Sequence, residues 1–198
     1  MGELLDKAIV FATSAHSGQV RKMANTPYIL HPLEVATIIA TLGGNEELMA
    51  AGLLHDTVED CNVDPLEIRK LFGSRVHALV ASETEDKLSD RPPEETWMER
   101  KQESLIMLKH SNDIDVKKLW LGDKLSNIRS FYRAYVKEGD AMWHYFHQND
   151  PKKQAWYYRT ITDCLSELSD TVAYKEYVML VEAIFASVSK EETNIELY

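Results

Sequence analysis

The sequence predicts an all-α fold in a single domain, and three observations support this prediction. Apolar residues recur three and four positions apart along most of the chain, which is the period of an amphipathic helix. No pair of strand-like segments is joined by a hairpin turn, and no change of composition marks a second domain. The 198 residues, 44% of them hydrophobic, are enough to bury one core. We expect the domain to cover residues 1–188 and a fraying tail to cover residues 189–198.

Capping residues and apolar periodicity place the helices at the start of the chain. The first expected helix spans residues 3–15, where the apolar residues fall on one face. A loop follows, and Pro32 begins the second helix, because its missing N–H costs nothing at the first helical position. That helix is expected to end near Gly43. Asn45 then caps a third helix, which we expect to continue through residues 53–60.

Proline and glycine divide the rest of the chain. Asp64 and Pro65 mark a capped helix start, Gly73 ends that helix, and Ser74 caps the next one. Residues 84–96 are polar, contain two prolines and show no periodicity, so we interpret them as a mobile surface loop. Helices are expected to resume over residues 97–110, 113–134, 140–148, 151–168 and 172–188.

Composition and charge argue against several classes of protein. The formal net charge of −10 disfavours a nucleic-acid or anionic-membrane binder, whose affinity needs clustered Lys and Arg. No segment approaches the roughly 20 continuous apolar residues of a membrane span, and the N-terminus is acidic where a signal peptide would be basic. Cys61 and Cys164 follow no metal or redox spacing, which is typical of free thiols in a reducing compartment. We expect a cytoplasmic protein that does not bind membranes.

The segment that directly follows Leu53 and Leu54 is the most informative part of the chain. It places one imidazole and three carboxylates within six residues, at the end of an apolar run. In a helix His55 would lie over Glu59, because residues four apart share a face, and Asp56 would lie over Asp60 for the same reason. Burying so many ionisable groups is unfavourable unless they are paired or bound to a cation. The segment therefore predicts a metal or proton-transfer site.

Four residues are candidate metal ligands: His31, His55, Asp56 and Asp123. Each has apolar neighbours, which indicates a rigid and partly buried position. Two imidazoles and two carboxylates form a mixed nitrogen and oxygen site that suits Mn²⁺, Fe²⁺ or Zn²⁺, with Mn²⁺ favoured when waters complete an octahedron. Taken singly, His31 could be an ordinary helix-start residue and Asp123 a surface acid. Spacing alone does not show that the three segments meet.

Further polar residues suggest catalytic and substrate contacts. Glu59 and Asp60 follow the His-Asp pair and could orient or deprotonate a water and protonate a leaving group, although a solvated helix end would look the same. Basic and amide side chains that could neutralise phosphates or read a base edge are Arg21, Lys22, Lys101, Lys124 and Asn127. Individually, such residues are more often surface charges.

A series of motifs in a fixed order resembles the hydrolase domain of RelA/SpoT enzymes, including the stand-alone metazoan form. The match covers roughly residues 1–165 and exceeds the generic HD signature. The motifs that carry it are His16–Lys22, Pro27–Leu33, Leu54–Asp60, Phe72–Gly73 and Asp123–Arg129. The resemblance implies an HD-domain helical bundle that hydrolyses the 3′-diphosphate of ppGpp or pppGpp with Mn²⁺. The products would be pyrophosphate and GDP or GTP.

The resemblance also implies roles for individual residues. The family's four metal ligands correspond to His31, His55, Asp56 and Asp123, and its catalytic acids to Glu59 and Asp60. Its guanine-stacking arginine and the neighbouring lysine correspond to Arg21 and Lys22, and its base-contacting asparagine to Asn127. Ser126 stands where the family often has histidine, which leaves base specificity open.

Two other readings of function stay open from the sequence. A phosphohydrolase of the same type could act on another nucleotide, for example by removing the 2′-phosphate of NADPH. A non-catalytic alarmone-binding module is the alternative from a different class, although a pure binder has no need of the acid pair. The aromatic residues between Trp143 and Tyr158 could form a core or a homo-oligomer interface, and we favour a core.

Overall fold

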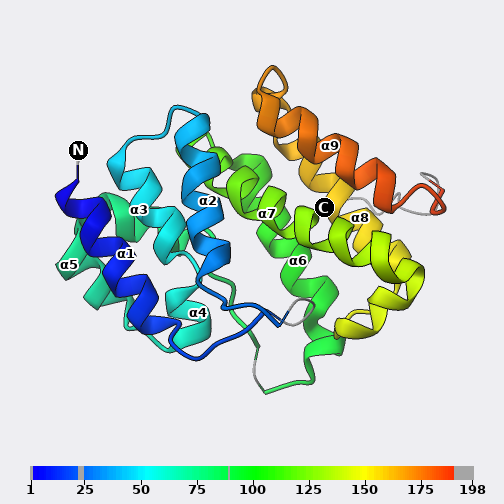
Figure 1. The fold of residues 1–198 in the computed structure, drawn as a ribbon, viewed down its shortest axis with the longest axis horizontal. Coiled ribbons are helices and arrows are strands. Elements are labelled where there is room, and N and C mark those ends of the chain that lie inside the picture. The colour runs from blue at the N-terminus through cyan, green and yellow to red at the C-terminus, as the bar shows by residue number, and fades with distance from the viewer. Residues whose placement is uncertain (1, 22–24, 89, 190–198) are drawn as a thin grey trace.

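The protein is described by a computed structural model that covers residues 2–21, 25–88 and 90–189. The described chain is built from helices joined by loops, and the only β-type pairing within it is an isolated bridge between Val20 and Pro27 (Figure 1). The prediction of an all-α fold is therefore confirmed. No helix in the described part of the chain is both long and apolar enough to cross a lipid bilayer.

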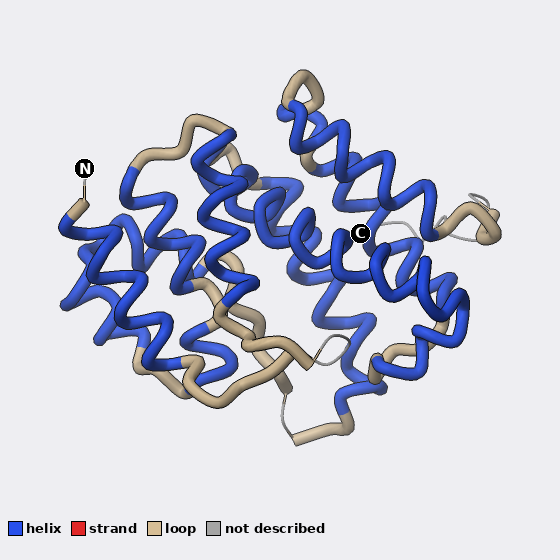
Figure 2. Tube along the Cα trace, viewed as in Figure 1, coloured by secondary structure: helices blue, strands red, loops and turns tan. Residues whose placement is uncertain are grey.

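The helices follow one another along the chain in the colour order of Figure 1, and Figure 2 shows them in blue with the connecting loops in tan. Their bounds are α1 (Glu3–Ala15), α2 (Leu30–Thr41), α3 (Glu46–Leu54), α4 (Thr57–Cys61), α5 (Pro65–Ala81), α6 (Pro93–His110), α7 (Ile114–Glu138), the 3₁₀ helix η1 (Gly139–Tyr145), α8 (Pro151–Cys164), the 3₁₀ turn η2 (Ser166–Leu168) and α9 (Val172–Ile184).

Side-chain caps fix several helix starts, as the sequence predicts. Asn45 accepts a hydrogen bond from the backbone N–H of Leu48 at the start of α3, and Asp64 caps α5 in the same way. Such caps stabilise a helix by about 1 kcal/mol each. Gly73 has φ 90° and ψ 169°, so it divides α5 into two helical halves at the predicted position. A residue with a side chain would be strained in that conformation.

The expected continuous helix through the His-Asp segment is wrong. Helix α3 ends at Leu54, and His55 and Asp56 form the turn that leads into α4. The hydroxyl of Thr57 donates to the Leu54 carbonyl at 2.7 Å, which gives that carbonyl a partner outside the helical ladder. The backbone N–H of Asp60 still bonds the Asp56 carbonyl at 2.8 Å, so the four-residue relationship of these two acids is kept within one turn.

Other boundaries differ by a few residues. The polar loop is shorter than expected, since α6 begins at Pro93. A missing N–H costs nothing at this position, and the two glutamates that follow interact favourably with the positive end of the helix dipole. Pro32 is the third residue of α2 rather than the first. The segment expected as a helix over residues 140–148 is the 3₁₀ helix η1. Beyond Ser189, the expected tail lies outside the described residues.

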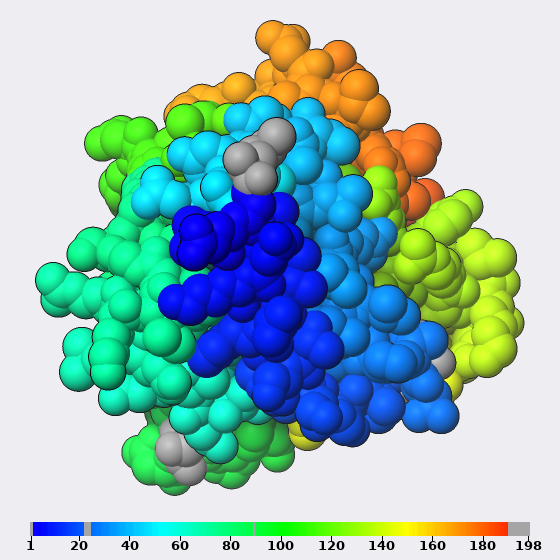
Figure 3. Space-filling model, turned by 60° about the vertical axis from the view of Figure 1, so that its left-hand side comes forward, coloured from blue at the N-terminus to red at the C-terminus, as the bar shows by residue number. Residues whose placement is uncertain are grey.

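Two clusters of buried side chains form the core, and α7 contributes to both. One cluster joins α1, α2, α3 and α5, and the other joins α6, η1, α8 and α9 to α7. Figure 3 shows α1, in dark blue, at the surface of the N-terminal half, where it packs on α3. Close packing of α2 on its neighbours depends on glycine: a Cβ at Gly52 of α3 would lie 2.5 Å from Ile39 Cδ1. Beside this contact, the start of α2, the end of α3 and the middle of α7 lie close together.

Candidate metal centre

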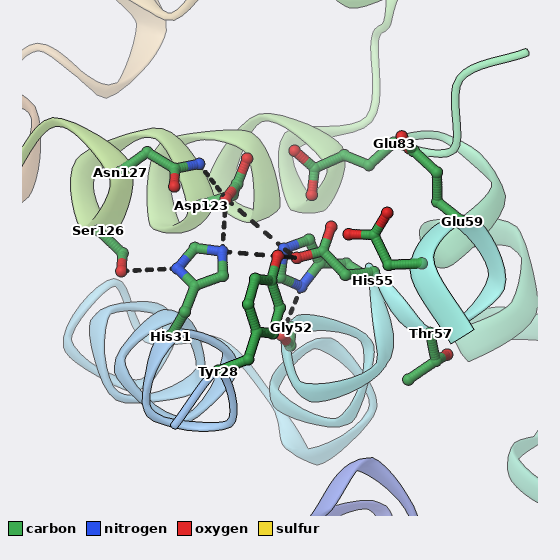
Figure 4. A network of polar contacts seen from close by, with 12 residues as sticks. Tyr28, His31, Gly52, His55, Thr57, Glu59, Glu83, Asp123, Ser126 and Asn127 are labelled. Carbon is green, nitrogen blue, oxygen red and sulfur yellow. Dashed lines mark hydrogen bonds and ion pairs between the residues drawn. The ribbon is translucent and has the colours of Figure 1, made fainter. Parts of the chain in front are cut away.

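Three segments that are distant in sequence converge between α2, α3 and α7. His31 comes from the first turn of α2, His55 from the turn after α3, and Asp123 from the middle of α7. All three side chains are buried, and one ligand atom of each lies within 4.8 Å of the others. In Figure 4 the two imidazoles and the Asp123 carboxylate point toward one another.

Asp56 completes the cluster. Its Oδ2 atom lies 3.0 Å from His55 Nε2 and 3.6 Å from His31 Nε2, while Asp123 Oδ1 lies 3.0 Å from His31 Nε2 and 3.5 Å from His55 Nε2. The hydroxyl of Tyr28 donates to Asp56 Oδ2 at 2.6 Å and fixes the carboxylate. The structure therefore brings together the four residues predicted as metal ligands.

Hydrogen bonds on the far side of each imidazole fix its tautomer. His55 Nδ1 lies 2.9 Å from the Gly52 carbonyl, which can only accept, so this nitrogen carries a proton. His31 Nδ1 lies 2.8 Å from the Ser126 hydroxyl, whose single proton is donated to Glu34 Oε2 at 2.7 Å. His31 Nδ1 must therefore donate as well. Both imidazoles thus turn Nε2 toward the carboxylates, the orientation that a metal-binding histidine requires.

The Nε2 atoms of His31 and His55 need a positive charge beside them. A neutral imidazole presents a lone pair at Nε2, and a carboxylate oxygen only 3.0 Å away is also an acceptor, so the contact is repulsive without a cation. Among the described residues, no group forms a hydrogen bond of good geometry with His55 Nε2. A divalent cation or added protons would relieve this arrangement, and the mixed nitrogen and oxygen donors suit a divalent metal.

The pKa shifts in the cluster also indicate that the centre requires a cation. Burial lowers the pKa of His31. Burial also acts to lower the pKa of His55, but the carboxylates of Asp56 and Asp123 outweigh it and leave that pKa well above its usual range. Burial acts to raise the pKa of Asp56, and the adjacent His55 reverses this, so the Asp56 carboxyl is held ionised. The carboxylates therefore stay negative and draw a cation to the centre.

Two predicted substrate contacts lie against the Asp123 carboxylate. The ammonium of Lys124 bonds Oδ2, and Asn127 Nδ2 donates to Oδ1 at 2.7 Å. Arg21 is linked to the same group, since its Nη2 donates to Asn127 Oδ1 and Ser130 Oγ, both at 3.1 Å. Arg21, Lys124 and Asn127 thus form one connected polar layer beside the cluster. Lys22, its predicted neighbour in the substrate clamp, lies outside the described residues.

The predicted catalytic acids occupy different surroundings. The Glu59 carboxylate is mostly buried, and burial, followed by the charges of Glu85 and Asp56, raises its pKa. Asp60 is more exposed and pairs with Lys87, whose Nζ lies 2.8 Å from Oδ1. Lys101, predicted to contact substrate, donates to Glu85 at 2.6 Å and is largely buried. These three roles stay predictions.

Several residues of the site were not singled out from the sequence. Tyr28 and Glu34 support metal-ligand candidates through hydrogen bonds, and neither spacing nor residue type indicates that they do. Glu83 precedes the polar segment of residues 84–96 and was given no role, yet its carboxylate lies among these groups. Helical spacing from the buried residues Val76 and Leu79 points position 83 inward and could have found it.

Two cavities adjoin the cluster, and Arg21 lines both. One, of about 480 Å³, is also lined by His31, Ser126 and Arg133. The other, of about 660 Å³, reaches Asp60 and Phe146. Each is within the size range of small-molecule sites. The first cavity gives a ligand access to His31, and the second to Tyr28 and Asn127, which bond Asp56 and Asp123.

Comparison with protein families gives a match to the HD domain over residues 8–147. Among curated proteins, a guanosine-3′,5′-bis(diphosphate) 3′-pyrophosphohydrolase of Aquifex aeolicus is 37% identical over 130 residues, covering 66% of this chain and 18% of the relative. A GTP pyrophosphokinase of Myxococcus xanthus is 35% identical over 130 residues, covering 65% and 17%. The chain thus spans less than a fifth of the length of these relatives.

Solved structures show the same fold. The crystal structure of lmo0812 from Listeria monocytogenes EGD-e is 36% identical with a TM-score of 0.69, over 79% of this chain and 99% of that one. A metazoan orthologue of SpoT that hydrolyses ppGpp has a TM-score of 0.67 at 24% identity, over 94% of this chain and 96% of its own. At that identity the second likeness concerns the fold alone.

Proposed function

This chain belongs to the HD domain family, and we propose that it is a metal-dependent hydrolase that removes the 3′-diphosphate of ppGpp or pppGpp. The products are pyrophosphate and GDP or GTP. Support comes from the ordered RelA/SpoT-type motifs and from curated relatives named as 3′-pyrophosphohydrolases of this nucleotide. The reaction takes place in the cytoplasm, and the domain that performs it covers residues 1–188.

The observation that carries the proposal is the orientation of His31 and His55. Each imidazole has its proton fixed on Nδ1 and directs Nε2 at the two carboxylates, which lie 3.0–3.6 Å from both nitrogens. The proposed ligands are His31, His55, Asp56 and Asp123, and the proposed ion is Mn²⁺, with Fe²⁺ or Zn²⁺ able to use the same donors. A bound divalent ion supplies a lowered pKa for its water and charge neutralisation at the phosphoryl group.

Glu59 is the proposed general base. It is close enough to Asp56 for that charge to raise its pKa, and it is mostly shielded from solvent. A carboxylate whose pKa is shifted toward neutrality accepts a proton from water more readily than an ordinary one. Asp60, at the more exposed edge beside Lys87, is the proposed general acid, which protonates the departing ribose 3′ oxygen.

The nucleotide is proposed to lie against Arg21. The guanidinium carbon of Arg21 lies 5.6 Å from the centre of the Tyr28 ring, and its Nη2 is held by Asn127 and Ser130. A planar, fixed guanidinium can stack on a purine, and with Lys22 it can neutralise phosphate charge. Lys101, Lys124 and Asn127 are the further proposed substrate contacts. The layer that Arg21, Lys124 and Asn127 form beside Asp123 would place the scissile phosphate next to the metal centre.

A product assay tests this function. The purified protein with Mn²⁺ is incubated separately with ppGpp, pppGpp and NADPH, and pyrophosphate and orthophosphate are measured. We expect pyrophosphate from the first two only, together with GDP or GTP. Orthophosphate from NADPH without pyrophosphate from ppGpp would instead indicate a 2′-phosphatase. Tight ppGpp binding with no product would indicate a regulatory module.

A further inference from the structure

Glu83 lies in the turn after α5, and its carboxylate is buried beside the metal centre. The side chain is 4% exposed, and in Figure 4 it extends toward Asp123 on α7. Among the described residues, no group donates a hydrogen bond to either carboxylate oxygen. The nearest cation is Lys124, whose Nζ is 3.7 Å from Oε1 and is already bonded to Asp123. Glu83 is therefore a buried acid without donors of its own.

Glu85, two residues later, is a second largely buried carboxylate, and its hydrogen-bond donors are protein groups. Lys101 donates to Glu85 at 2.6 Å, Arg100 at 2.9 Å and Ser104 at 3.1 Å. Buried polar groups in folded proteins nearly always have such partners. The contrast indicates that the partner of Glu83 is not one of the described protein groups.

The surroundings of Glu83 indicate what this partner is. The charges acting on its carboxylate come from Lys124, Asp123, His55 and Asp56, which are the residues of the metal centre and its neighbour. Burial is the main cause that raises the pKa of Glu83, to about 7. A carboxylate in such a position gains most from a strong hydrogen-bond donor, and water bound to a divalent cation is one.

The inference rests on the metal centre of the proposed function. We propose that Glu83 is a positioning residue of that centre, whose carboxylate accepts a hydrogen bond from a water molecule bound to the divalent ion. The carboxylates of Asp56 and Asp123 each lie 3.0–3.6 Å from both imidazole Nε2 atoms, whereas the Glu83 oxygens form no hydrogen bond with any described residue. A carboxylate that faces the centre without joining these contacts suits a link through a bound water rather than direct ligation. Partners of this kind typically change metal affinity 10–100-fold.

Metal titration of matched variants tests the proposal. Mn²⁺ affinity is measured from the electron paramagnetic resonance signal of the free ion for the wild-type chain, Glu83→Gln and Glu85→Gln. The two substitutions remove the same charge two residues apart. We expect about a 10–100-fold loss of affinity in Glu83→Gln and a clearly smaller loss in Glu85→Gln. Unchanged affinity in Glu83→Gln, or equal losses in both, would overturn the proposal.

Two further readouts separate this role from others. A Glu83 that only pairs with Lys124 would lower the melting temperature of the metal-free Glu83→Gln variant and leave Mn²⁺ affinity unchanged, against the proposal. Water-proton relaxation counts the waters on Mn²⁺, and we expect the same number in both proteins. One additional water in Glu83→Gln would identify Glu83 as a direct ligand and overturn the water-mediated role.

Glu83→Met, which removes the carboxylate without leaving a polar group, is a second variant expected to lose affinity in the same way. Failure of the wild-type chain to bind Mn²⁺ would contradict the proposed function itself.

Discussion

The Ser126 hydroxyl lies between His31 Nδ1 and Glu34 Oε2, at 2.8 Å and 2.7 Å, and determines which nitrogen of His31 is free. Glu34 is held in turn by Arg129, whose Nη1 donates to Oε1 at 2.9 Å and whose other nitrogens bond Glu176 of α9. A chain of polar contacts therefore runs from the metal centre across α7 to the C-terminal helix. The orientation of His31 therefore depends on residues that are not among the four proposed ligands.

Ser126→Ala removes this relay and should weaken metal binding. His31 Nδ1 then loses its acceptor, and the imidazole can adopt the tautomer that turns a protonated Nε2 toward the site. We expect about a 10–100-fold loss of Mn²⁺ affinity, measured by titration of the purified variant. Ser82→Ala, which removes a hydroxyl that bonds only the Leu79 carbonyl, is the matched control and should keep its affinity. Equal Mn²⁺ affinity in Ser126→Ala and the wild-type chain would show that the relay has no such role.

Glu59→Gln should separate chemistry from metal binding. The amide keeps the size of the side chain but cannot accept a proton from water. We expect an unchanged Mn²⁺ content and a kcat lower by about 10²–10⁴-fold, the usual effect of losing a general base. Steady-state kinetics with ppGpp together with metal analysis of the same sample provide the check. A variant with full kcat would remove Glu59 from the mechanism.

The pH dependence of kcat should report on the same carboxyl. Burial raises the pKa of Glu59, with Glu85 and Asp56 adding to the effect. Below that pKa the carboxyl holds a proton and cannot act as a base, so kcat should fall as the pH drops through a value above the usual range of glutamate. The profile is measured over roughly pH 5–8. The acidic limb should be absent in the residual activity of Glu59→Gln, and its persistence there would assign it to another group.

Arg21→Ala should affect substrate binding more than metal binding. The guanidinium lines both cavities and is fixed by Asn127 and Ser130, but it bonds none of the four proposed ligands. We expect KM for ppGpp to rise while Mn²⁺ content stays at the wild-type level. Arg91→Ala is the control, since Arg91 is an exposed residue that pairs with Glu99, and this variant should keep the wild-type KM. Loss of metal in Arg21→Ala would mean that Arg21 supports the centre instead.

Local features of the fold could be predicted from the sequence because they depend on neighbouring residues. Asn45 and Asp64 cap helices as expected, and Gly73 breaks α5 with a positive φ. The break between Leu54 and Thr57 was missed, because it depends on one hydroxyl that bonds a carbonyl three residues earlier. Helical period alone does not reveal that competition.

The site itself could be predicted only in part. His55 and Asp56 stand out by residue type, but their proximity to Asp123 depends on the packing of α2, α3 and α7, and spacing along the chain does not determine it. The expectation that these segments meet came from the resemblance to a known family. The environment of Glu83 was not predicted, since the three-dimensional structure alone shows that its oxygens lack donors among the described residues.

Metal analysis of the purified protein tests the central claim most directly. After chelation and reloading with Mn²⁺, the wild-type chain should bind one ion per chain, and His55→Ala and Asp123→Ala should bind none. His110→Ala, which changes an exposed histidine at the end of α6, should bind one. Retention of one tightly bound ion by both His55→Ala and Asp123→Ala would contradict a single centre built from α2, α3 and α7.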